Sequence, residues 1–227
     1  MMPLLSGLAH WLALVAGLAL PGCCALRYCN PRRVLQGRDL LLRITGGLVL
    51  LAVTSTLVVL ALRAALASGD PQDALNPTAW LAFARTTRSG QLLVVQGLLA
   101  LAGAAVWCTP AWRRGAPAAV AGLTALALAG LLCASPTSHA ASGGVGLILI
   151  HALHLATVAW WFGGLLTLII WQMQSHTPGR DATLRALAGF SRIAMPMMVI
   201  TVVSGCILAW TQIAPVWASL VATQYGI

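Results

Sequence analysis

Two histidines inside a long apolar stretch are the residues best suited to chemistry in this chain. His151 and His154 lie three positions apart within residues 143–173, a run longer than the ~20 residues that cross a bilayer. This spacing puts both imidazoles on one face of a helix, where they would reach a single ligand or ion. Hydrocarbon penalises polar side chains, so ionisable residues at such positions usually have a function. Neutral imidazole binds copper without bringing anionic charge into the membrane, and the pair therefore predicts a metal site.

Two further histidines extend this candidate site. His139 precedes the apolar stretch and would either capture a metal at its mouth or be a solvated loop residue. His10 lies in the first apolar run and would join the site if that run packed against the run that holds His154. The alternative is that His151 and His154 only make hydrogen bonds to neighbouring helices.

Sulfur-containing side chains provide a second set of candidates. Met195 and Met198 share a helical face, and their thioethers suit Cu(I) on a path that continues inward; the alternative is that they fill gaps between apolar helices. Cys23, Cys24 and Cys29 could receive Cu(I) as reduced thiols, but they match no standard metal motif, so we interpret them as small helix residues.

Composition restricts the fold to a membrane bundle. Of the 227 residues, 59% are hydrophobic and only 7% are charged, which is more apolar surface than a soluble domain can hide. Continuous apolar runs argue against alternating β-strands. We predict an all-α, polytopic transmembrane helical bundle of about six spans, with these approximate bounds: 4–26, 40–67, 90–108, 116–134, 143–173 and 190–213.

The loop charges predict the orientation of the bundle. Ten arginines follow the first, third and fifth runs: Arg27, Arg32, Arg33, Arg38, Arg43, Arg113, Arg114, Arg180, Arg185 and Arg192. Only three follow the second and fourth runs: Arg63, Arg85 and Arg88. The positive-inside rule therefore places both termini outward, in the periplasm of a bacterium, and His10, His139, His151 and His154 in the outer half. It also accounts for the net charge of +9 without a nucleic-acid partner.

A faint internal repeat divides the chain at residue 138. Arg43-Ile44 and Arg192-Ile193 open the second and sixth runs, and eleven residues later stand Thr54-Ser55 and Val203-Ser204. Residues 1–138 would form a first four-helix repeat, and residues 139–227 would form a partial second one in the same orientation. Such a duplication predicts that the first and fifth runs are neighbours.

A set of short motifs then points to a family. They stand as His139-Ala140, His154-Leu155, Trp161-Phe162-Gly163-Gly164-Leu165, Phe190-Ser191-Arg192, Ser204-Gly205 and Thr223 with Tyr225-Gly226. Their order and spacing resemble the copper-resistance D (CopD) family of bacterial inner-membrane proteins, whereas residues 1–138 match only in layout. The chain departs from that family at His151 and in lacking the last two of eight expected spans, so it looks truncated at the C-terminus.

The resemblance implies a copper-handling permease of the inner membrane, active in copper uptake or homeostasis, with a periplasmic CopC-like carrier as partner. Copper would arrive at His139, pass His151 and His154 with help from His10, and leave past Met195 and Met198. Two alternatives stay open: a b-type haem protein with His10 and His154 as axial ligands, or a membrane dock for the carrier. No phosphate loop, nucleophile triad or carboxylate pair is present in the sequence, so we expect no enzyme and no catalytic residues.

Overall fold

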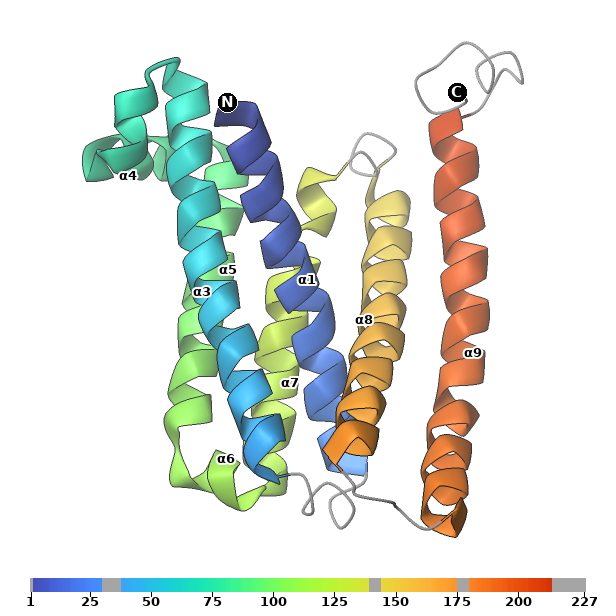
Figure 1. Ribbon diagram of the computed structural model, residues 1–227. Helices are drawn as coiled ribbons and strands as arrows, with labels where there is room; N and C mark the ends of the chain where they lie inside the picture. Colours follow the sequence, from blue (N-terminus) through green and yellow to red (C-terminus); the bar gives the residue numbers. More distant parts are fainter. Residues whose placement is uncertain (1, 30–37, 139–143, 175–179, 214–227) are drawn as a thin grey trace.

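The chain forms a bundle of long helices that run alternately up and down (Figure 1). The computed structural model describes residues 2–29, 38–138, 144–174 and 180–213. Met2 and Ile213 both lie at the end that is uppermost in Figure 1, which we call the upper end; the opposite end is the lower end.

The six predicted apolar runs are all helical. They are α1 (Met2–Cys29), α3 (Arg38–Ser68), α5 (Arg88–Cys108), α7 (Pro117–Leu132), α8 (Val145–Gln174) and α9 (Arg180–Ile213). Five are long and apolar enough to cross a membrane, whereas α7 has 16 residues and is shorter. At ~1.5 Å per residue α7 spans only ~24 Å. The prediction of an all-α, multi-pass membrane bundle is confirmed, since the described residues contain no strand.

Four short helices occupy segments that the sequence predicted as loops. They are η2 (Pro71–Leu75), α4 (Pro77–Thr86), α6 (Pro110–Arg114) and η3 (Ser135–Thr137). Three of them begin with a proline that follows a capping side chain: Asp70, Asn76 and Thr109. Each cap accepts a hydrogen bond from a backbone N–H of the first turn, which is the usual signal for a helix start. The prediction of loops was wrong here because proline was interpreted only as a helix breaker.

The last long helix also begins earlier than predicted. The sequence placed the start of this span at residue 190, at the edge of its most apolar part, but α9 begins at Arg180. Apolarity marks the part of a helix that lies in hydrocarbon, whereas backbone hydrogen bonding continues into the polar segment before it.

Helix α1 runs through the bundle between α3, α7 and α8 (Figure 1). Its small residues Ala16, Ala19 and Cys23 are buried, which lets the neighbouring helices approach closely. The tightest approach is to α8. A Cβ on Gly22 would lie 2.3 Å from the carbonyl oxygen of Ala159, and one on Gly163 would lie 2.4 Å from that of Ala19. The two backbones therefore touch at glycines that no other residue can replace without a shift.

The arginines form two groups, one at each end of the bundle. Arg63, Arg85 and Arg88 belong to the upper ends of α3, α4 and α5, and Arg43 and Arg113 belong to the lower ends of α3 and α6. This separation is the one that the loop charges imply. Which end faces the periplasm stays a prediction, and so does the division of the chain into two repeats at residue 138.

Substituting Gly22 tests the contact between α1 and α8. We expect Gly22→Ala to lower the free energy of unfolding by roughly 1–3 kcal/mol, because the new methyl group overpacks a backbone contact. Gly122→Ala is the control, since a Cβ at Gly122 meets no heavy atom within 4 Å. That control should be neutral or stabilising, because alanine is the better helix former. Thermal unfolding in detergent measures both, and equal midpoints would contradict the close contact.

Candidate functional site

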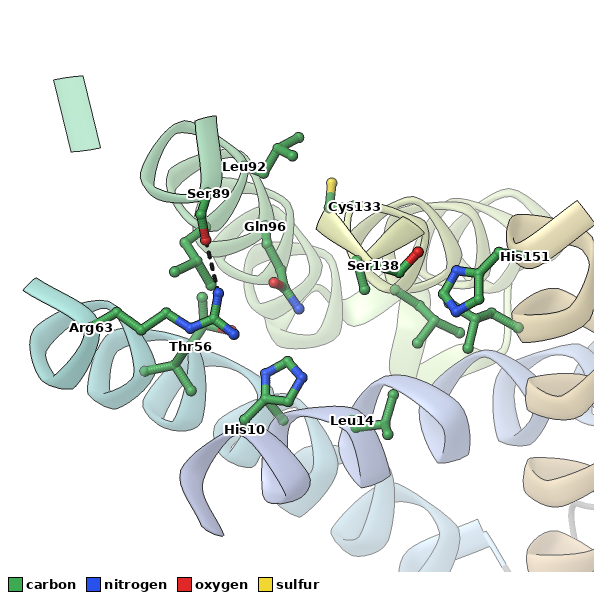
Figure 2. A pocket seen from close by; sticks show the side chains of 16 residues that line it. His10, Leu14, Thr56, Arg63, Ser89, Leu92, Gln96, Cys133, Ser138 and His151 are labelled. Atoms are coloured by element: carbon green, nitrogen blue, oxygen red, sulfur yellow. Dashed lines mark hydrogen bonds between the residues drawn. The ribbon is translucent and has the colours of Figure 1, made fainter. Parts of the chain in front are cut away.

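A cavity of about 240 Å³ lies toward the upper end of the bundle, where α1, α3, α5 and α8 meet the segment after α7 (Figure 2). Polar side chains from all of these elements line it: His10, Thr56, Arg63, Ser89, Gln96, Cys133, Ser138 and His151. Between long apolar helices such a concentration of polar groups is costly unless it serves a ligand or a path. We take this cavity as the candidate functional site.

The cavity brings together two of the predicted histidines. His10 comes from α1 and His151 from α8, and both rings line the same space (Figure 2). His151 is half-buried, and its Nδ1 lies 3.1 Å from Oγ of Ser135. These histidines meet because α1 packs along α8, as the prediction that the first and fifth runs are neighbours requires.

Arg63 is a cavity residue that the sequence analysis assigned only to loop charge. Its Nη1 donates a hydrogen bond of 2.8 Å to Oγ of Ser89, which ties α3 to α5 (Figure 2). The guanidinium fixes one positive charge in the wall of the cavity. Arg63 could have been identified from the sequence as a polar residue within an apolar run. The same argument applies to Thr56 and Gln96.

His154 faces another helix. Its Nδ1 lies 3.1 Å from the carbonyl oxygen of Thr201 and 3.1 Å from Oγ of Ser204, both on α9. A carbonyl oxygen only accepts, so in a neutral imidazole this contact favours the tautomer with the proton on Nδ1 and the lone pair on Nε2. Metal-binding histidines are commonly oriented by just such a hydrogen bond to a backbone carbonyl. The same contact also fits the alternative, in which His154 links two helices.

Further polar groups surround the His154 contact. Oγ1 of Thr201 donates to Oγ1 of Thr157 at 2.8 Å, so α8 and α9 share a second side-chain hydrogen bond. Gly205 makes room for the imidazole, since a Cβ there would lie 3.3 Å from Cε1 of His154. Together these groups hold the middle of α9 against α8.

His151 and His154 therefore have different partners, although they are only three positions apart. His151 contacts Ser135 and lines the cavity, whereas His154 contacts α9 and is not among the cavity-lining residues. His139 lies outside the described residues.

The sulfur-containing candidates lie elsewhere. Met195 is 57% exposed and Met198 is 42% exposed, both on the surface of α9 and neither in the wall of the cavity. Cys23 and Cys24 are buried, and the thiol of Cys23 lies 3.5 Å from the carbonyl oxygen of Gly163, which fits their interpretation as packing residues.

One cysteine does reach the cavity. Cys133 lines it from the end of α7, and its thiol is free. Across the described ranges, however, no three His, Cys, Asp or Glu side chains lie close enough to hold one metal ion. The cavity thus offers scattered single ligands and not a closed metal cage.

Comparison with known proteins gives one match. The family profile described as copper resistance protein D-like, N-terminal domain, matches residues 1–147, which is most of the 227-residue chain. The matched part contains His10 and ends before His151. It is also the part in which the sequence showed only a similar layout, with the quoted motifs standing almost entirely beyond it. Neither the curated proteins nor the solved structures include a significant match.

Replacing Ser204 tests the contact between α8 and α9. We expect Ser204→Ala to cost about 1 kcal/mol of stability, because His154 loses an acceptor on the neighbouring helix. Ser55→Ala is the control: Ser55 is also buried, but the hydrogen bonds of its hydroxyl go to carbonyls of its own helix. Thermal unfolding in detergent compares the two variants, and equal losses would show that the bond between the helices contributes nothing.

Proposed function

The chain belongs to the copper resistance protein D-like family, and from this premise we propose that it is a copper permease of the bacterial inner membrane. The family and the five long apolar helices make it a copper-related, multi-pass membrane protein. The observation that supports a path for copper is the cavity in which His10 and His151, from two helices far apart in sequence, line one space.

Copper would enter this cavity from the upper end. His139 precedes α8 in the chain and would take the metal first, and His10 and His151 would receive it inside. His154 lies one helical turn further along α8, with Nε2 available as a ligand. Met195 and Met198, near the middle of α9, are the thioether candidates for the last part of the path.

A site that binds its metal with few ligands suits transport. A transported ion must bind well enough to enter and weakly enough to leave, so a closed cage of several ligands would trap it. The described part of the cavity wall offers imidazoles and one thiol, with no carboxylate, and it includes the positive charge of Arg63. These features favour brief occupancy by copper over storage.

The same proposal includes a donor at the upper end. A periplasmic CopC-like carrier would deliver copper there, and the function would be copper uptake or homeostasis. In a weaker version the chain is only a membrane dock for that carrier. The haem alternative has less support, because His154 faces α9 and does not share the cavity of His10.

Copper binding and transport test the role of the two cavity histidines. In the purified protein we expect His10→Ala and His151→Ala each to weaken Cu(I) binding at least tenfold, because each removes one imidazole ligand. Competition with a coloured Cu(I) chelator measures the affinity, and copper movement into proteoliposomes measures transport. His176→Ala is the control, since that histidine follows α8 and lies outside the proposed path.

The result also separates the alternatives. Unchanged copper binding and transport in His10→Ala/His151→Ala would overturn the proposed path. A Soret absorption band in the purified protein, lost in His10→Ala, would establish the haem protein instead.

Arg63 provides an independent test of weak binding. Removing its charge should raise the affinity for Cu(I) roughly fivefold to tenfold, because a fixed cation repels a metal ion in the same cavity. We expect this gain in Arg63→Gln and not in Arg63→Lys, which keeps the charge. Arg85→Gln is the control for net charge, because Arg85 is exposed at the same end. The same affinity in all three variants would contradict an electrostatic role.

A further inference from the structure

A second cavity, of about 760 Å³, lies at the lower end of the bundle and plays no part in the copper proposal. It is a groove lined by residues of α3, α5 and α6. Its walls are largely apolar, with Val49, Leu50, Val53, Leu101 and Ala104 among them. Its volume falls in the range of about 300–1,000 Å³ that is typical of small-molecule sites.

Two arginines stand at one end of this groove. Arg43 comes from the first turns of α3 and Arg113 from α6, and both line the cavity. Both residues are exposed. None of the groove-lining side chains that the structure describes is acidic. The site is therefore apolar along its length and positively charged at its mouth.

The groove has the depth of one membrane leaflet. From Arg43 to Val53 it follows ten residues of α3, or ~15 Å at 1.5 Å per residue. That length is half of the ~30 Å hydrocarbon core of a bilayer. An occupant that lay along it would keep its polar end at the interface and its apolar part among the helices.

Trp107 and Gly47 give the groove its shape. The indole of Trp107 packs over Gly46, where a Cβ would lie 2.5 Å from the ring, and so forms part of the groove wall. A Cβ on Gly47, in contrast, would meet no heavy atom within 4 Å. The space beside Gly47 is thus open to an acyl chain.

We propose that this groove binds an anionic phospholipid, with the phosphate between Arg43 and Arg113 and an acyl chain along α3. Basic pockets between transmembrane helices on the cytoplasmic side commonly hold such headgroups. The positive-inside rule predicts the same side for this end of the bundle.

Lipid retention in native mass spectrometry tests the site. The purified protein is titrated with phosphatidylglycerol, with phosphatidylcholine of the same acyl chains, and with inorganic phosphate. We expect a preference for phosphatidylglycerol and no binding of phosphate alone. Arg43→Gln/Arg113→Gln should lower the affinity for phosphatidylglycerol about 30-fold, which corresponds to ~1 kcal/mol for each charge near the membrane surface.

Two further variants make the outcome decisive. Arg85→Gln/Arg88→Gln removes the same number of positive charges at the upper end. This variant should still prefer phosphatidylglycerol to phosphatidylcholine. Gly47→Leu adds a larger side chain to the groove wall, at a position where a Cβ meets no heavy atom within 4 Å, and should weaken the binding of both lipids. Gly7→Leu, where a Cβ also meets no heavy atom, lies outside the groove and should change the binding of neither lipid. Equal retention of the two lipids by the wild type would overturn the proposal. So would equal effects of the two arginine pairs, or full binding by Gly47→Leu.

Discussion

The cavity of the candidate site depends on the contact between α1 and α8. At Gly22 and Gly163 the backbones lie so close that a Cβ on either residue would collide with a carbonyl oxygen of the other helix. Hydrophobic burial provides little force between helices inside lipid, so close van der Waals packing of small residues must hold them together. Above this contact the two helices bring His10 and His151 into one cavity.

The arginines at the two ends of the bundle have different surroundings. At the upper end, Arg63 donates a hydrogen bond to Ser89 and places a positive charge in the wall of a polar cavity, where it would repel a cation. At the lower end, Arg43 and Arg113 stand at the mouth of an apolar groove and make it favourable for an anion. The loop rule assigned every arginine to topology, whereas these three also line cavities.

The histidines show the limit of arguments from spacing. His151 and His154 are three positions apart, which on an α-helix corresponds to about 60° around the axis. That angle keeps both on one broad face, as predicted, yet it is wide enough for different neighbours. His151 contacts Ser135 near the cavity, and His154 contacts Thr201 and Ser204 on α9.

The sequence by itself determined the class of fold, the six helical runs and the histidines worth considering, because a lipid environment imposes long apolar helices and penalises every polar residue within them. It did not reveal the capped short helices or the early start of α9, whose local signals are weaker than the apolar pattern. Only the tertiary structure decided that His10 shares a cavity with His151, that Arg63 lines it, and that His154 contacts α9. These contacts join residues from helices far apart in the chain, and they are set by how closely particular glycines and small side chains let those helices pack.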